Sequence, residues 1–253
     1  MRKRNESNKG LFFILLIFFV IIIFCFYNQK WFGFGISEKE AVAEKKEVKT
    51  PVLKNYEIKT EKINEKSNGA EISAEYPSFN DNNIVNENIK SLIDAKIKDF
   101  RDSLDVGSNI DNTDQFLNIS YDSNKYARNI FSIKFDIIYG GGIHPIEDID
   151  CKTYDLDNSK EIKLSNIFKE NSNYLNKISE LVYDELVKDT DADIAWIKEG
   201  TLPNAENFSK FILKDNSIIF YFPAGSVASN VSGTKEVKIP LSSLKVFLSS
   251  LFE

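Results

Sequence analysis

The side chains with the clearest potential for chemistry lie in and beside a glycine-rich loop. His144 is the single histidine of the chain, and it stands between three glycines and an acidic stretch that includes Glu147 and Asp148. Zinc requires several nitrogen or sulfur ligands, which one imidazole among loop carboxylates does not supply. The glycines allow backbone conformations closed to other residues, so we expect a structural loop without a metal. If the loop has a function, we expect it to bind a partner. The residues concerned are Gly140, Gly141, Gly142 and His144.

A second spacing resembles a calcium-binding loop. Asp189, Asp191 and Asp193 alternate along the chain as such ligands do. Ile194 stands where the turn glycine belongs, and Gly200 stands where the bidentate glutamate belongs. We therefore interpret this segment as a solvated loop.

Nucleophile motifs are incomplete as well. Ser242 and Lys245 satisfy the Ser-x-x-Lys spacing, but the partner motifs that give this spacing a meaning are missing. No Gly-x-Ser-x-Gly or phosphate-loop motif occurs, and no histidine is available to pair with Cys151. The 38 acidic residues could contain an acid/base carboxylate pair, which only geometry would reveal. The sequence thus identifies no catalytic, cofactor-binding or metal-binding residue.

The charge of the chain is unevenly spread. The net charge is −6, and the first ten residues carry +3, which leaves −6 − 3 = −9 for the remainder. An acidic domain without a basic stripe is a poor match for nucleic acid. A cationic protein or peptide would be favoured electrostatically, although an ordinary acidic surface explains the same charge.

The two cysteines are not expected to form a disulfide. Cys25 lies in an apolar N-terminal run, and Cys151 lies far along the polar part of the chain. A thiol embedded in lipid and a thiol in an exterior domain cannot easily meet. The strand-like surroundings of Cys151 favour a buried, packed thiol.

An N-terminal apolar run predicts a membrane anchor. From Leu11 to Tyr27 the chain has seventeen residues without a charged or strongly polar group. At 1.5 Å per residue they cover about 26 Å, close to the roughly 30 Å hydrocarbon core of a bilayer. The basic residues before the run keep the N-terminus in the cytoplasm by the positive-inside rule. A cleaved signal peptide is the alternative, but the small residues at Ala41 and Ala43 lie far beyond the end of the run.

The expected organisation follows from this anchor. We predict a cytoplasmic tail over residues 1–10, a transmembrane helix over 11–27 and a Lys/Glu-rich stalk over 28–54. Two exterior α+β subdomains then follow, over residues 55–144 and 145–253.

Hydrophobic periodicity predicts the elements of the exterior part. Apolar residues at spacings of three and four predict helices over residues 85–104 and 174–188 and a terminal helix after Pro240. Alternating apolar residues predict strands, most of them in hairpins with turns at Asn68-Gly69, 155–160 and Asp215-Asn216. The expected fold class is α+β, with antiparallel sheets covered by helices in two adjoining subdomains.

Motifs in three places resemble a pair of neighbouring domains. The C-terminal and central motifs resemble a domain family of unassigned activity, and the N-terminal motif is similar to its companion domain. The motifs are Tyr139 to Pro145, Tyr154-Asp155-Leu156, Phe208, Ile218 to Pro223, Val237 to Leu241, and Tyr76-Pro77 before a helix that ends in Phe100.

The resemblance covers roughly residues 54–250. This pair of domains forms the extracellular half of a membrane-bound anti-sigma factor that binds lysozyme, and it precedes the catalytic domain of a cell-wall polysaccharide deacetylase. The sequence departs from both, because about ten residues before the apolar run leave no room for a sigma-binding domain and no deacetylase domain is seen. The resemblance implies an exported binding domain of the cell envelope.

We therefore expect a single-pass protein of the cell membrane with an extracellular or periplasmic C-terminal domain. The domain would bind a cell-envelope component, either peptidoglycan or a cationic wall-lytic protein such as lysozyme, without a cofactor. Two alternatives stay open. One is a carboxylate-dependent enzyme that acts on cell-wall glycans, and the other is a structural or assembly component of an envelope complex.

Overall fold

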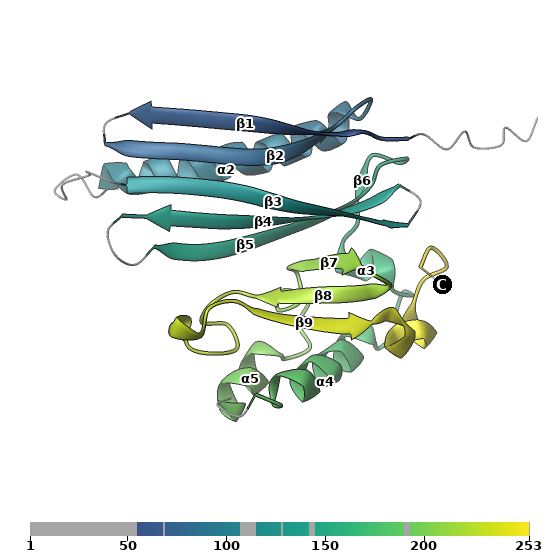
Figure 1. Cartoon of the computed structure of the whole chain (residues 1–253). Coiled ribbons are helices and arrows are strands. Elements are labelled where there is room, and N and C mark those ends of the chain that lie inside the picture. The colour runs from purple at the N-terminus through teal and green to yellow at the C-terminus, as the bar shows by residue number, and fades with distance from the viewer. Residues whose placement is uncertain are drawn as a thin grey trace, which may run out of the picture. The chain divides into compact units, whose positions relative to one another are not determined.

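The computed structural model describes residues 55–67, 69–106, 115–127, 129–141, 145–189 and 193–252 (Figure 1). They belong to one compact unit, Leu53–Glu253. The predicted cytoplasmic tail, transmembrane segment and stalk lie outside the described residues. Within the described residues, no helix combines the length and the apolar character needed to cross a membrane.

Six strands form a mixed sheet in which the order along the chain is also the order in the sheet. They are β1 (Ile58–Ser67), β2 (Ala70–Phe79), β3 (Gln115–Ala127), β4 (Ile130–Gly140), β5 (Ile146–Asp155) and β6 (Lys160–Glu161). Neighbouring strands are antiparallel, apart from the parallel pair of β2 and β3. The predicted first hairpin is confirmed, since Ser67 pairs with Ala70 and Gly69 adopts a φ of 80° in the turn.

The helix α2 (Asn83–Val106) explains the parallel pair. It carries the chain back along one face of the sheet, so that β3 starts at the same end as β2 (Figure 1). The N–H of Val85 donates to Asn82 Oδ1 at 3.3 Å, which caps the start of the helix. The helix prediction is confirmed. The expectation of purely antiparallel sheets is wrong at this crossover, because an alternating pattern does not encode strand direction. The residues of α2 that are buried against the sheet are Val85, Ile89, Ile93, Ile97 and Phe100.

A second, smaller sheet is antiparallel with the order β7-β8-β9. Its strands are β7 (Phe211–Lys214), β8 (Ser217–Phe222) and β9 (Lys235–Pro240). Asp215 and Asn216 adopt φ values of 49° and 55°, the positive values that a two-residue hairpin turn requires. This confirms the hairpin predicted at these residues.

The central strand β8 is buried on both faces. Ile219 and Tyr221 pack against Ile149 and Cys151 of the larger sheet. The opposite face of β8 packs with residues of the helix α4 (Tyr174–Leu186), among them Ile178. A strand covered on both sides must be apolar throughout, which accounts for the continuous apolar run.

Short helices complete the C-terminal half. They are α3 (Leu164–Ile167), α5 (Ile194–Gly200), η1 (Asn230–Ser232) and η2 (Leu241–Phe247). The prediction of α4 is confirmed. The predicted terminal α-helix is instead the 3₁₀ helix η2, in which Leu241 and Leu244 are buried. Residues three apart share one face of a 3₁₀ helix, so the three-residue spacing of Leu241 and Leu244 is compatible with an α-helix or a 3₁₀ helix.

The two sheets meet where β7 of the smaller sheet contacts β3, β4 and β5 of the larger one. Ser132 Oγ accepts the N–H of Leu213 at 2.9 Å and lies 2.8 Å from Thr153 Oγ1, and these contacts are buried. The larger sheet continues through β5 and β6 to Glu161, so it extends across residue 145, where the sequence suggested a division. The α+β class is confirmed, with one sheet mixed and the other antiparallel.

Candidate functional site

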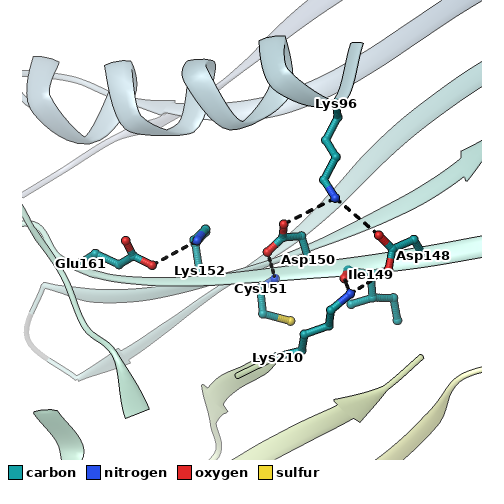
Figure 2. A network of polar contacts seen from close by, with 8 residues as sticks. All are labelled: Lys96, Asp148, Ile149, Asp150, Cys151, Lys152, Glu161 and Lys210. Carbon is teal, nitrogen blue, oxygen red and sulfur yellow. Dashed lines mark hydrogen bonds and ion pairs between the residues drawn. The ribbon is translucent and has the colours of Figure 1, made fainter. Parts of the chain in front are cut away.

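The free edge of β5 carries a network of polar contacts (Figure 2). β4 pairs along the whole of β5, whereas β6 covers only its last two residues. Unpaired strand edges invite pairing with other chains unless charged side chains block them. Asp148 Oδ1 accepts the N–H of Ile149 at 2.8 Å, and Asp150 Oδ1 accepts the N–H of Cys151 at 2.9 Å. The strand's own carboxylates therefore occupy these edge N–H groups.

Two lysines from distant elements converge on these carboxylates (Figure 2). Lys96 Nζ on α2 lies 3.4 Å from Asp148 Oδ2 and 3.8 Å from Asp150 Oδ2. Lys210, which precedes β7, places its Nζ 2.7 Å from Asp148 Oδ1 and also donates to the carbonyl of Ile149. Asp148 thus connects the helix that covers the larger sheet to the segment that enters the smaller one.

The electrostatic surroundings hold Asp148 ionised and the thiol of Cys151 protonated. Burial opposes ionisation of Asp148, but the hydrogen bond and charge of Lys210, the N–H of Ile149 and the charge of Lys96 outweigh it and lower its pKa. Burial, with a smaller contribution from Asp150, raises the pKa of Cys151 to about 12. The burial predicted for Cys151 is confirmed.

This network is suited to holding the fold together and is unsuited to acid/base chemistry. A general acid or base works best when its pKa lies near the working pH, and the pKa of Asp148 is shifted in the opposite direction. The thiol of Cys151 is a poor nucleophile because it is protonated, and the thiolate is the form that reacts. We interpret the cluster of Lys96, Asp148, Asp150 and Lys210 as a structural clamp, and we call it the β5 clamp.

The β5 clamp predicts a pH-dependent contribution to stability. The pKa of Asp148 is lower in the folded state than in the unfolded state, so its contribution is present above the unfolded pKa of about 3.9 and is lost as the pH falls through the folded value. Asp148→Asn should therefore lower the free energy of unfolding at pH 7, and the difference from the wild type should shrink toward pH 3. Urea denaturation of residues 53–253 at both pH values measures it.

Asp102→Asn serves as the matched control for this experiment. Asp102 pairs with Lys98 one turn away on the exposed side of α2, where such pairs contribute little. An Asp148→Asn difference that stays constant between pH 7 and pH 3 would contradict the clamp.

The loop predicted to bind a partner is described only in part. Gly140 ends β4 with a φ of 133°, and Gly141 lies against the side chain of Gln115. A Cβ atom at Gly141 would lie 2.1 Å from Gln115 Nε2, so a larger residue there would have to displace the end of the Gln115 side chain. Gly142 and His144 lie outside the described residues, and the prediction of partner binding stays a prediction.

The remaining sequence motifs are placed in the C-terminal half. Asp193 Oδ1 accepts the N–H groups of Ala195 and Trp196 and thereby caps α5. Asp189 pairs with Lys235 at 3.2 Å, and Asp191 lies outside the described residues. Among the side chains that the structure describes, no group of three His, Cys, Asp or Glu residues is arranged to hold a metal ion.

A hollow lies at the corner where the larger sheet meets the end of the smaller one. Its volume is about 330 Å³. Lys134 Nζ lies 5.4 Å from the centre of the Tyr221 ring and 2.9 Å from Asp136 Oδ1. The basic group that enters this corner is therefore already paired. The other charged groups of the lining are Glu147, Asp148 and Glu236.

A second cavity, of about 390 Å³, lies between α5, the end of α4, the loop before η1 and the start of β9. It combines an exposed indole with carboxylates, hydroxyls and an ammonium group. Its lining residues are Leu186, Asp189, Asp193, Trp196, Ile197, Val227, Ala228, Ser229, Ser232 and Lys235. Its volume lies within the range of small-molecule sites, and we call it the Trp196 pocket.

The region that contains the Trp196 pocket belongs to a known family. The family model described as "Protein of unknown function (DUF3298)" matches residues 165–242. This chain contains a DUF3298 domain. The DUF3298 match covers α3 through the smaller sheet and includes every residue that lines the Trp196 pocket.

Two relatives extend the comparison beyond the DUF3298 domain. Peptidoglycan-N-acetylmuramic acid deacetylase PdaC of Bacillus subtilis is 35% identical over 183 residues, which are 70% of this chain and 38% of PdaC. The part of PdaC to which this chain is homologous is its N-terminal region. An esterase of Mycobacterium tuberculosis is 28% identical over 104 residues, 41% of this chain and 45% of that protein. The chain therefore spans less than half the length of either relative.

Solved structures of DUF3298 proteins share the fold. A member from Bacteroides fragilis has a TM-score of 0.56 at 18% identity, covering 77% of this chain and 94% of its own. A member from Pseudomonas aeruginosa has a TM-score of 0.56 at 12% identity, covering 79% and 97%. At these identities the likeness concerns the fold alone.

Sequence reasoning missed both the β5 clamp and the Trp196 pocket. The lysines of the clamp are 52 and 62 residues away from Asp148 along the chain, so no local spacing links them. The pocket had one usable signal in the sequence, which is a tryptophan three residues after a helix-capping aspartate.

Proposed function

We propose that this chain is a non-catalytic module that binds peptidoglycan at the outer side of the cell membrane. The observation that carries the proposal is the relation to PdaC, whose name gives peptidoglycan as its substrate. The related segment is only 38% of PdaC and is its N-terminal region. A common need to bind the wall would explain why this segment occurs both in a wall enzyme and in this chain.

The geometry supports binding more than it supports reaction. The carboxylates of Asp148 and Asp150 on β5 are engaged by Lys96 and Lys210, and the thiol of Cys151 beside them is buried and protonated. The Trp196 pocket, in contrast, presents an exposed ring and polar groups to solvent.

A second candidate ligand is a cationic wall-lytic protein such as lysozyme. The observation in its favour is the charge of −9 that residues 11–253 carry, as −6 − 3. Complementary charge would speed the encounter with a basic protein and would make binding sensitive to salt.

The two ligands can be separated by titration. Residues 53–253, which form one compact unit, are titrated calorimetrically with soluble peptidoglycan fragments and with lysozyme, in about 0.05 M and about 0.5 M salt. We expect saturable binding of the fragments that persists at the higher salt concentration. Binding of lysozyme alone, lost at the higher salt, would instead favour the second candidate. Absence of binding to both would remove the proposed function.

The proposal includes an anchor formed by residues 11–27, with the described unit outside the cell. It is supported by the length of the apolar run and by the basic residues before it. The mass of the protein recovered from the membrane fraction tests it. The full chain is expected there, and a soluble protein that begins near Glu44 would contradict the anchor.

A further inference from the structure

The Trp196 pocket presents an aromatic ring that is held in a fixed orientation. The side chain is 37% exposed, although it belongs to a large apolar residue type. Its Nε1 donates to the carbonyl of Gly225 at 3.0 Å, and its backbone N–H donates to the capping carboxylate of Asp193. Both the ring and the start of α5 are thereby fixed before any ligand arrives, which lowers the entropy cost of binding.

The packing of α5 on the neighbouring loop reinforces this orientation. Gly200 lies one helical turn after Trp196, on the same face of α5. A Cβ atom at Gly200 would lie 2.1 Å from the carbonyl oxygen of Ser226 and 2.7 Å from Val227 Cγ1. The helix and the loop that supplies Gly225 therefore pack closely at Gly200 and are joined at Trp196 by the bond from its Nε1 to the carbonyl of Gly225.

The polar groups of the Trp196 pocket offer both hydrogen-bond donors and acceptors. Lys235 Nζ lies 3.2 Å from Asp189 Oδ2, and the hydroxyls of Ser229 and Ser232 lie 3.0 Å apart. Asp193 uses Oδ1 for the helix cap, and a carboxylate has lone pairs for further bonds. Apolar side chains, among them Val227, lie in the same lining.

This composition selects one class of ligand. Two carboxylates against one lysine, which is already paired with Asp189, disfavour a phosphate or another anion. A purely apolar ligand would remove the charged and hydroxyl groups from water without adding a hydrogen bond to them, which is unfavourable. A sugar ring has an apolar face of C–H groups and a rim of hydroxyls, so it can cover the indole while its hydroxyls bond to the carboxylates and serines. The apolar lining can accept the methyl of an acetamido group.

We infer that the Trp196 pocket binds an N-acetylated hexosamine of a glycan chain. The inference rests on the proposed function, because peptidoglycan is the source of such a sugar in the envelope. It goes further by giving the position of contact and the part of the polymer that is recognised, which is the glycan and not the peptide.

A fluorescence titration tests the pocket directly. Of the two tryptophans of the chain, Trp31 and Trp196, residues 53–253 contain only Trp196, so their tryptophan emission reports on this pocket alone. We expect a saturable change in emission with oligomers of N-acetylglucosamine and a much weaker one with oligomers of glucose, which lack the acetamido group. Trp196→Ala should weaken binding of the oligomer, measured by calorimetry, by about tenfold or more.

Two further variants keep the test interpretable. Trp196→Phe retains an aromatic face and should retain part of the affinity, which covers the case in which Trp196→Ala fails to fold. Ile84→Ala removes an exposed apolar side chain of α2, 58% exposed, at a site outside the lining of the pocket, and should bind as the wild type does.

The outcomes distinguish the pocket from the proposed function. Binding of peptidoglycan fragments without a change in Trp196 emission, and with equal affinity in Trp196→Ala, would overturn the pocket and leave the proposed function standing. A response to the oligomer without any binding of peptidoglycan would support the pocket and overturn the proposed function. No response to either ligand would overturn both.

Discussion

Phe208→Ala is expected to lower the free energy of unfolding by about 3–5 kcal/mol, the largest effect of any single change considered for this protein. Phe208 is fully buried, and its ring packs edge-on against Phe220 at 5.4 Å and Phe222 at 6.1 Å between centroids. Alanine would remove the apolar area and leave a cavity between the smaller sheet and α4, which rigid neighbours cannot fill. Urea denaturation of residues 53–253 at pH 7 measures the loss.

Phe116→Ala is the matched control for the core substitution. Phe116 lies on β3 and is only partly buried, so the same chemical change should cost clearly less. Equal losses for the two variants would show that the aromatic cluster around Phe208 is not a centre of stability.

Ser132→Ala is expected to cost about 1–3 kcal/mol, because it leaves buried polar groups without a partner. The hydroxyl accepts the N–H of Leu213 from the smaller sheet and contacts Thr153 of the larger one. Ser132 is fully buried, so water cannot replace the lost bonds. The same denaturation experiment gives the magnitude, and amide hydrogen exchange at Leu213 should become faster.

Ser73→Ala provides the comparison for this buried bond. Its hydroxyl donates to Asn64 Oδ1 at 3.3 Å on the exposed part of the larger sheet, where substitutions usually change stability by less than about 0.5 kcal/mol. If Ser132→Ala also stayed below this value, the contact would not be what joins the two sheets.

The elements of the fold could be predicted where local patterns determine them. The apolar residues of α2 recur at spacings of three and four, which is enough to predict a helix with one buried face. Asp215 and Asn216 are residue types that tolerate the positive φ values of a tight turn, so the turn is predictable from these two residues. The same reasoning could not give the parallel pairing of β2 and β3, because the direction of a strand depends on the path of the helix between them. It also could not show that β5 and β6 join the first sheet, because the sequence pattern of a strand does not specify which strand it pairs with.

The candidate sites were harder to predict for a related reason. Asp148 was noticed as an acidic neighbour of His144, yet its partners Lys96 and Lys210 come from a helix and from a loop far away in the sequence. Trp196 owes its importance to Gly225 and Lys235, which only the tertiary fold brings to the same cavity. Residue types can suggest chemistry, but their convergence is a property of the packed chain.

The charged groups of the β5 clamp stabilise the fold, whereas those of the Trp196 pocket are available to a ligand. The clamp closes a strand edge that would otherwise be open to pairing with other chains. The pocket leaves its ring and its hydroxyls open to solvent. We therefore predict that Asp148→Asn lowers the free energy of unfolding at pH 7 without changing ligand affinity. Trp196→Ala should lower ligand affinity without changing the free energy of unfolding.

Co-sedimentation with purified, insoluble peptidoglycan sacculi tests the central claim most directly. Residues 53–253 are mixed with increasing amounts of sacculi at physiological salt, and the pelleted fraction is measured for the wild type and for Trp196→Ala. We predict a saturable pelleted fraction for the wild type that is reduced in the variant. A wild-type domain that is folded and stays entirely in the supernatant at every amount of sacculi would contradict the account.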